Sequence, residues 1–437
     1  MSLNRSHFVL NKHVQSRMAR FTRRTALSML GVTGSVAVMG GVAMNGVASA
    51  SAQKRDNGHD DDPLESFQEV RSDLRPGGTY DQFLRDLAAQ DQFSGNVLLA
   101  HRGRPILTRS YGMAYKAQDI PNRPETLFLL ASVTKAFTAT AVLQLVQNGQ
   151  VALDATLGTY LSDFTGDAAT RITIHHLLTM TSGLGDYSQM PGWYQESKTW
   201  TSASAVLDGT MSYILAEQPQ FPPGSGYFYS NSGFVILGKI VAQVAGVDYW
   251  DYMRRNVFRP AGMTRTDFYP RDQVLGMMAD GTMAHNYASQ HGGARVDLLT
   301  YGKPMFIGLP DGAGGPHTTA ADMLAFATAL RNGTLLRPDY VRLALNGKTP
   351  LSPLPTPFDD AIQLYFSGYG LTDTLINDRH ILSHAGEGPG VTSNLDIYPT
   401  LDWVAIVLEN YDLQPFGLIP DACPLVKLER QLITRSQ

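Results

Sequence analysis

The sequence predicts a mixed α/β (α+β) fold: an antiparallel sheet built from both chain ends, flanked by helices, with an inserted helical lobe. Two observations lead to this prediction. Strand-like segments lie near the beginning of the globular part of the chain and again near its C-terminus. The residues between them, roughly 156–345, are rich in helix-like periodicity and in loops.

The first 52 residues differ in kind from the rest of the chain. They contain six basic residues and no Asp or Glu, and the pair Arg23-Arg24 precedes an uncharged, moderately apolar run that ends in small residues. This order predicts an export signal peptide over residues 1–52, and the arginine pair favours the twin-arginine route. A membrane anchor is the alternative, but the Gly, Ser, Thr and Asn content favours cleavage. We therefore expect a periplasmic or secreted protein with no stable membrane anchor.

Residues 53–74 are expected to form a polar linker, and residues 75–437 the folded domain. The chain has 35 Lys+Arg and 39 Asp+Glu. Without the six basic residues of the expected signal, 29 basic residues face 39 acidic ones, which is a net charge of −10. Such an acidic protein is not expected to bind nucleic acid. Cys423 is the only cysteine, so no internal disulfide can form.

The individual elements follow from local patterns. A hairpin is expected from strands at 95–100 and 105–108, joined by a turn at 101–104. A helix is expected at 132–148 with Gly149 as its C-terminal cap. Further helices are expected at 174–180, 205–216, 233–244 and 320–331, the last with Thr319 as N-cap. The chain is expected to end with strands at 391–397 and 403–408 and an amphipathic helix at 424–434.

Ser132 and Lys135 are the first candidate catalytic pair. On a helix, residues three apart share a face, so the hydroxyl and the amine would be neighbours. Lys135 is the only strongly charged residue between residues 127 and 153, and burial would lower its pKa. A neutral amine could then take a proton from the serine and make it a nucleophile. The alternative is a lysine whose ammonium reaches solvent from an otherwise packed helix.

Tyr229 and Asn231 form the second candidate stretch, directly before an apolar helix. A tyrosine near a cationic lysine would have a lowered pKa and could shuttle protons. Asn231 offers a donor and an acceptor to an amide or carbonyl substrate. The alternative is simple helix capping by Ser230, Asn231 or Ser232.

The third stretch runs from Ser383 to Gly390 and includes His384, Gly386 and Glu387. Its glycines would let a backbone approach a ligand closely, and an N–H group at a strand edge there could complete an oxyanion hole. The alternative is an ordinary glycine-rich turn with an exposed histidine.

In this order, the three stretches resemble the serine β-lactamase and penicillin-binding-protein superfamily, most closely its class C β-lactamase-like branch. That branch also contains D-alanyl-D-alanine carboxypeptidases, D-aminopeptidases and esterases. The motif S-x-x-K matches Ser132 and Lys135, Y-x-N matches Tyr229 and Asn231, and H-x-G matches His384 and Gly386. The resemblance covers roughly residues 80–435 and implies a β-lactamase/transpeptidase-like fold.

The resemblance implies a serine hydrolase. Ser132 would form an acyl-enzyme, Lys135 and Tyr229 would act as base and acid, and Asn231 would hold the substrate. His384 would line the opposite wall, and the N–H groups of Ser132 and Glu387 would form the oxyanion hole. No metal or organic cofactor is implied, and the partner would be a small-molecule or peptide substrate. The pair His175-His176 would be structural, in the core or at a helix start.

Two departures bear on the substrate. His384 stands where typical class C β-lactamases have lysine, and it is expected to be largely neutral at pH 7. Glu387 stands where small residues are usual, and if its carboxylate points into the cleft it should repel an anionic substrate. We therefore expect hydrolysis of an ester, an amide or a D-amino-acid peptide, in the manner of a D-alanyl-D-alanine carboxypeptidase or an esterase, rather than efficient β-lactamase action.

Three questions stay open from the sequence. A class C-type β-lactamase is an alternative, and a non-catalytic penicillin-binding sensor is an alternative from another class, although all three motifs favour an enzyme. An ordinary α/β-hydrolase is disfavoured because no G-x-S-x-G occurs. Aromatic residues in the loop after residue 184 are expected either to shape an apolar pocket or to pack the loop: Tyr187, Trp193, Tyr194 and Trp200.

Overall fold

The computed structural model describes residues 71–200, 202–290, 294–301, 311–351, 356–358, 361–412 and 423–435. All of them belong to one compact unit, Asp62–Gln437. The expected signal peptide and almost all of the expected linker lie outside the described residues, so both stay predictions. Within the described residues no single helix is long and apolar enough to cross a membrane. The bent helix pair Asn231–Ala245 and Tyr249–Ala261 has the length and composition of a span only when its two helices are taken together.

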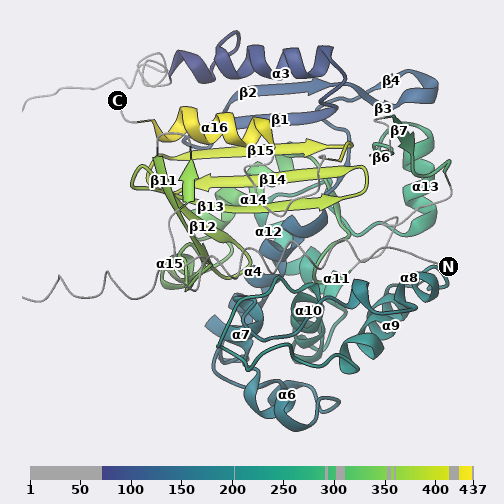
Figure 1. Ribbon diagram of the computed structural model, residues 1–437, viewed down its shortest axis with the longest axis vertical. Helices are drawn as coiled ribbons and strands as arrows, with labels where there is room; N and C mark the ends of the chain where they lie inside the picture. The colour runs from purple at the N-terminus through teal and green to yellow at the C-terminus, as the bar shows by residue number, and fades with distance from the viewer. Residues whose placement is uncertain are drawn as a thin grey trace, which may run out of the picture. The chain divides into compact units, whose positions relative to one another are not determined.

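Nine of the described strands form one antiparallel sheet, in the order β10-β11-β12-β13-β14-β15-β1-β2, with β9 also pairing with β11. Strand β1 from near the N-terminus pairs with β15 from near the C-terminus, and Figure 1 shows them side by side. The predicted sheet built from both chain ends is therefore confirmed. Its strands are β1 Gly95–His101, β2 Arg104–Tyr111, β9 Thr349–Pro350, β10 Thr356–Phe358, β11 Ala361–Ser367, β12 Thr372–Ile376, β13 Arg379–Gly388, β14 Val391–Tyr398 and β15 Trp403–Glu409.

The expected hairpin at the start of the sheet is confirmed. Its turn residues Arg102 and Gly103 both have positive φ, 52° and 72°. Positive φ at both central residues is the requirement of the tight turns that match the twist of paired strands. The smaller two-stranded sheets are β3 Met113–Tyr115 with β4 Ile120–Pro121, β5 Phe128–Leu129 with β8 His317–Thr318, and β6 Tyr287–Ser289 with β7 Arg295–Asp297.

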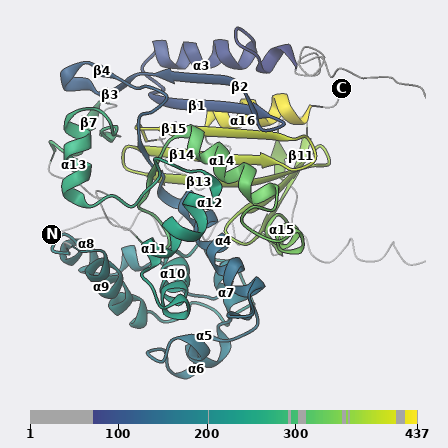
Figure 2. The same cartoon turned by 180° about the vertical axis from the view of Figure 1, so that it is seen from behind.

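Helices cover both faces of the large sheet. Helix α16 (Pro424–Thr434) lies over one face together with α3 (Thr79–Ala89), whereas α14 (Ala320–Arg331) lies over the other, as the two opposite views show (Figures 1 and 2). Successive residues of a strand point to opposite faces. Val97 and Leu99 accordingly pack in the core under α3 and α16, and Leu98 packs in the larger core on the other face.

The remaining helices lie mostly between β5 and β9 in the chain. The expected helix at 132–148 begins as the 3₁₀ turn η3 (Ala131–Val133) and continues as α4 (Thr134–Gln147), followed by Gly149 at φ 72°. Thr319 caps α14 as expected, because its side chain accepts from the Asp322 N–H. The others are α5 Leu157–Tyr160, α6 Gly166–Arg171, α7 Ile174–Leu178, α8 Trp193–Ser197, α9 Ala203–Leu215, α10 Asn231–Ala245, α11 Tyr249–Met253, α12 Arg259–Ala261, α13 Arg271–Ala279 and α15 Pro338–Ala344.

Candidate active site

Ser132 lies in η3, at the entry to the buried helix α4. The preceding residue, Ala131, has φ 49°, in the left-handed region that residues with a Cβ rarely adopt. Such backbone conformations cost roughly 1–3 kcal/mol and cluster at functional sites. Ser132 remains partly exposed, whereas Lys135, one turn further on, is fully buried. The strained turn therefore presents the serine hydroxyl at the surface of an otherwise packed helix.

The Lys135 ammonium nitrogen has three partners. Nζ lies 3.0 Å from Ser132 Oγ, 2.7 Å from Asn231 Oδ1 and 3.0 Å from the carbonyl oxygen of Ala313. Burial lowers the pKa of Lys135 to about 7, and the negative charges of Asp311 and Asp186 oppose this shift. The sequence-based expectation of a lowered lysine pKa is therefore met, and a large share of Lys135 is neutral near pH 7.

In the neutral form of Lys135, the lone pair of the amine points in a defined direction. A neutral amine has two N–H donors and one lone pair. Asn231 Oδ1 and the Ala313 carbonyl can only accept, so they take the two N–H groups. The remaining partner is the Ser132 hydroxyl, which can donate. The lone pair of neutral Lys135 is thereby directed at the proton of Ser132.

Tyr229 lies beside this pair, directly before Ser230, whose side chain caps α10 by accepting from the Gly233 N–H. Lys135 Nζ is 5.0 Å from the centre of the Tyr229 ring, and Tyr229 is hydrogen-bonded to Ser132. The predicted lowering of the Tyr229 pKa is wrong. Burial raises it, the hydrogen bond to Ser132 opposes the rise, and the charges of Asp186 and Glu387 add to it. Tyr229 is therefore a proton donor at neutral pH.

Asn231 is the first residue of α10, and its amide is held from both sides. Its Oδ1 accepts from Lys135, and its Nδ2 donates to Asp186 Oδ2 at 2.8 Å. Asp186 lies two residues after the segment 181–184, and the sequence offered no spacing signal that separated it from an ordinary loop carboxylate. The structure thus adds Asp186 to the residues at the site.

Asp311 is a second carboxylate near Lys135 that sequence reasoning missed. Its Oδ2 accepts from the hydroxyl of Tyr187 at 2.6 Å, and its Oδ1 accepts from the N–H groups of Ala313 and Gly314 at 2.8 Å each. Burial raises the pKa of Asp311, and these hydrogen bonds and the charge of Lys135 oppose the rise. Asp311 therefore fixes the loop whose carbonyl, at Ala313, binds Lys135.

His384 lies in β13 and is buried. Its Nδ1 donates to the carbonyl oxygen of Gly370 at 2.9 Å, and its ring centre is 6.5 Å from that of Tyr229. Burial and the charge of Lys135 lower the pKa of His384 to about 3, against the effect of the Gly370 hydrogen bond. The imidazole is consequently neutral at physiological pH, as the sequence suggested.

Gly386 and Glu387 lie on the part of β13 that pairs with β14 but not with β12. Strand β12 pairs with β13 only from Arg379 to Ser383, so its pairing with β13 ends before Gly386. Gly386 lies so close to the nucleophile that an added Cβ would be 3.0 Å from Ser132 N and 2.4 Å from Leu130 O. Only glycine fits at this approach of strand to turn.

The backbone N–H of Glu387 points to the side of β13 opposite to β14. Gly388 pairs with Val391 across the two-residue turn that joins β13 to β14. In the alternation of antiparallel pairs back from this turn, Gly388 and Gly386 bond toward β14, whereas the Glu387 N–H points away from β14. The Glu387 side chain starts on the face opposite to His384, is half-buried, and is close enough for its charge to raise the pKa of Tyr229.

The aromatic loop proves to be packed rather than open. Tyr187 and Trp193 are each 7% exposed, their ring centres are 4.9 Å apart, and Trp193 also contacts Trp200 edge-on. His176 takes part in the cap of α7, and His175 Nδ1 is 2.9 Å from the hydroxyl of Tyr369. No group of three or more His, Cys, Asp or Glu able to hold a metal occurs among the described residues.

Comparison with known proteins identifies the family. Residues 80–419 match the Beta-lactamase family, and the chain therefore belongs to it. The chain is 28% identical over 336 residues to Penicillin-binding protein 4* of Bacillus subtilis (strain 168), which covers 74% of this chain and 69% of that relative. It is 33% identical over 204 residues to Esterase EstB of Burkholderia gladioli, which covers 44% of this chain and 51% of the esterase.

A solved structure of similar fold is that of D-amino acid amidase from Ochrobactrum anthropi SV3 complexed with L-phenylalanine. The identity is 26% and the TM-score 0.64, over 82% of this chain and 98% of the amidase. The predicted superfamily and fold class are thus confirmed. Penicillin-binding, esterase and amidase relatives together support a hydrolase of the penicillin-binding-protein and β-lactamase family.

Proposed function

We propose that this protein is an exported serine hydrolase that forms an acyl-enzyme on Ser132 and cleaves an ester, an amide or a D-amino-acid peptide bond. The observation that carries the proposal is the position of Lys135. The amine is buried, has a pKa of about 7, lies 3.0 Å from Ser132 Oγ, and has only carbonyl groups as its other partners. These are the properties required of a general base that activates a serine.

The reaction would proceed in two halves. Lys135 takes the proton of Ser132 as Oγ attacks the substrate carbonyl, and the N–H groups of Ser132 and Glu387 stabilise the oxyanion. Tyr229, protonated and hydrogen-bonded to Ser132, passes a proton to the leaving group. Water then attacks the acyl-enzyme. Tyr229 and Lys135 transfer the proton of this water to Ser132 Oγ, and the free serine is restored.

The charges around the site favour a neutral or amine-bearing substrate. His384 is neutral where a lysine would offer a cation to a carboxylate, and Asp186 and Glu387 add negative charge near Tyr229. An ester or an amide, or the peptide bond of a D-amino acid, suits this field better than an anionic β-lactam. The esterase and D-amino acid amidase relatives are consistent with this choice.

A class C-type β-lactamase is the second candidate, favoured by the shared family. A penicillin-binding sensor would require slow or absent deacylation. Export is proposed from residues 1–52 alone, and cell fractionation with N-terminal sequencing of the mature protein tests it.

Intact-protein mass spectrometry distinguishes these candidates. The purified protein is treated separately with benzylpenicillin, a p-nitrophenyl ester and a D-amino-acid amide, alongside Ser132→Ala. We expect turnover of the ester or the amide, little reaction with benzylpenicillin, and neither in the variant. A stable penicillin adduct without turnover of any substrate would favour the sensor. Rapid opening of penicillin would favour the β-lactamase.

The role of Glu387 is tested by Glu387→Gly. If its carboxylate sets the charge preference, the variant should accept carboxylate-bearing substrates better relative to neutral ones. An unchanged preference would rule this role out.

A further inference from the structure

We propose that Asp186 is a positioning residue that fixes the Asn231 amide and thereby the direction in which Lys135 acts. The inference rests on the proposed function, because it concerns how Ser132 is activated. It concerns a residue outside the three motifs, in the loop that precedes η4 (Tyr187–Gln189).

The Asn231 side chain has one preferred orientation. An amide can present either its oxygen or its NH₂ group to a neighbour, and the two choices have nearly the same shape. Both oxygens of the Asp186 carboxylate accept: Oδ2 from Asn231 Nδ2 at 2.8 Å and Oδ1 from the Ser188 N–H at 3.0 Å. Asn231 must therefore turn its NH₂ toward Asp186 and its oxygen toward Lys135.

The orientation of Asn231 decides which partners Lys135 can serve as donor and as acceptor. With the Asn231 oxygen in place, the lysine uses its N–H groups on Asn231 and Ala313, and its lone pair faces Ser132. If the amide turned over, its NH₂ would face Lys135 Nζ and compete with Ser132 for the lone pair. The Asp186 carboxylate thus selects the arrangement in which Lys135 is a base toward Ser132.

Asp186 is itself held in place by the residues around it. The neighbouring Gly185 N–H donates to Glu217 Oε2 at 2.9 Å, and the Gly185 carbonyl accepts from Ser230 Oγ at 2.8 Å. Ser230 is the cap of α10, and Asn231 is the next residue. The next pair is also joined, since the Tyr187 N–H donates to Ser232 Oγ at 2.9 Å. Residues 185, 186 and 187 are therefore bonded to residues 230, 231 and 232 in turn, so the Asp186–Asn231 contact is well defined.

Asp186→Asn is the sharpest test, because it preserves size but leaves one oxygen and one NH₂ where two acceptors are needed. Whichever way the new amide turns, either the Ser188 N–H or Asn231 Nδ2 loses its acceptor. We expect the rate of Ser132 activation to fall by at least about tenfold, the scale seen for misplaced catalytic groups. Because the charge of Asp186 raises the pKa of Lys135, its removal should also shift the acidic limb of the rate profile to lower pH.

The readout is the second-order rate of Ser132 phosphonylation by a fluorophosphonate probe, followed by intact mass from pH 5 to pH 9. In this reaction the Oγ–P bond forms, the P–F bond breaks, fluoride leaves, and Lys135 takes the serine proton. No knowledge of the natural substrate is needed. Asp186→Glu, which keeps two acceptors and the charge, should recover part of the rate. Asp208→Asn is the matched control, since Asp208 pairs with Lys239 at the surface of the protein.

The outcomes separate the inference from the proposed function. If the wild-type protein is not labelled, or if Ser132→Ala is labelled equally, the proposed function and the inference both fail. If the wild type is labelled and Asp186→Asn keeps its rate and its pH profile, only the inference is overturned. A lowered melting temperature with an unchanged pH profile would assign Asp186 a merely structural role and would also overturn it. A lower rate with a shifted acidic limb supports it.

Discussion

The imidazole of His384 donates from Nδ1 to the carbonyl oxygen of Gly370 at 2.9 Å. Gly370 itself packs on α4, where an added Cβ would lie 2.5 Å from the Lys135 carbonyl oxygen. Gly370 thus contacts both His384 and the turn of α4 that carries Lys135. Since the pKa of His384 is about 3 and that of Lys135 about 7, only the lysine changes its charge near neutral pH.

The first prediction concerns this assignment. The acylation rate should fall as the pH decreases through about 7, because Lys135 becomes protonated and loses its lone pair. His384→Asn removes a group that is already neutral, so the acidic limb should stay where it is. A pH–rate profile of both proteins with a neutral ester checks this. If the acidic limb disappeared in the variant, His384 rather than Lys135 would be the group that titrates.

The second prediction concerns Tyr229→Phe. Loss of the phenol removes the proton donor next to Ser132 but leaves Lys135 in place, so acylation should slow by about 10²–10⁴-fold, the usual scale of general acid–base catalysis. The acidic limb should remain, because it belongs to Lys135. Single-turnover kinetics measures this step. A variant with the wild-type acylation rate would show that the tyrosine has no part in it.

The third prediction concerns the space between β13 and η3. In Gly386→Ala, the new methyl group would lie 2.4 Å from Leu130 O and 3.0 Å from Ser132 N, so strand and turn must separate. Covalent labelling of Ser132 should be nearly lost. Gly276→Ala, in helix α13 with no atom within 4 Å of the new Cβ, is the control and should keep full labelling. Equal labelling of the two variants would contradict the proposed oxyanion hole.

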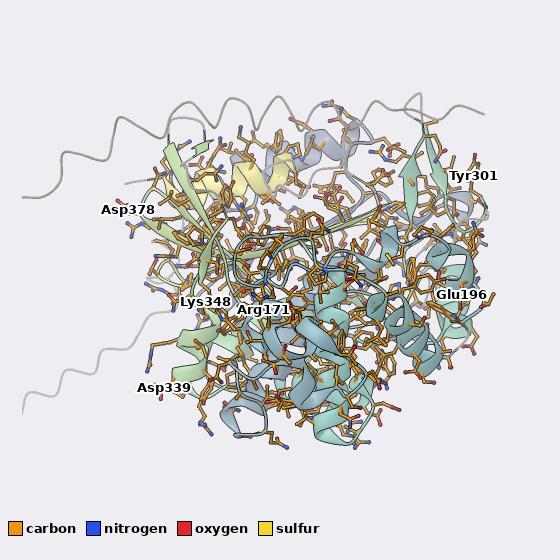
Figure 3. All side chains as sticks on the ribbon, turned by 60° about the horizontal axis from the view of Figure 1, so that its bottom comes forward. Arg171, Glu196, Tyr301, Asp339, Lys348 and Asp378 are labelled. Atoms are coloured by element: carbon orange, nitrogen blue, oxygen red, sulfur yellow. The ribbon has the colours of Figure 1, made fainter. Side chains whose placement is uncertain are left out.

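The fourth prediction concerns the exposed side chains of Tyr227 and Phe228, which we expect to form an apolar rim beside Tyr229. These neighbours of Tyr229 are 37% and 40% exposed, which is unusual for large apolar side chains. Phe228→Ser should raise KM for aryl and long-chain esters more than for acetate esters. Tyr301→Ser is the control, because Tyr301 is also exposed but lies at the periphery of the molecule, as Figure 3 shows. A parallel change in both variants would dismiss the rim as a substrate contact.

The fifth prediction concerns stability. Glu409 is the last residue of β15 and is buried, and burial raises its pKa to about 8. The folded protein therefore retains a proton that the unfolded chain releases above about pH 4.5, so the free energy of unfolding should fall as the pH rises from 4.5 to 8. The loss is on the order of a few kcal/mol. Urea unfolding at pH 5.5 and 8 should show a smaller difference for Glu409→Gln than for the wild type; an equal difference would refute the assignment.

Much of this architecture was predictable because local patterns and the final structure agree. The strands of the hairpin at 95–108, the helix after Ser132 and the last strand are short apolar runs with turn or capping residues at their ends. Strand β13 was harder to predict, since its end is rich in glycine, which is usually depleted in strands. Its glycines serve the close approach to Ser132, a tertiary constraint that no local pattern records.

The candidate site likewise has one part that the sequence predicted and one part that it did not. The three motifs brought Ser132, Lys135, Tyr229, Asn231 and His384 to one place. Asp186 and Asp311 carry no motif, and only the folded chain shows that they support Asn231 and the Ala313 loop. The sign of the Tyr229 pKa shift could not be predicted either, because it depends on how burial and two carboxylates compare with the hydrogen bond to Ser132.

The pairing of β1 with β15 has a consequence for biosynthesis. Ser132 emerges early in translation, but the strand segment that faces it, at 384–388, follows after more than half of the chain length. Contacts of such sequence separation are slow to form, because a long loop must close first. A nascent or C-terminally truncated chain would therefore carry the serine without its opposite wall. Reactivity at Ser132 should appear only when the last strands have joined the sheet, which makes covalent labelling a direct report of completed folding.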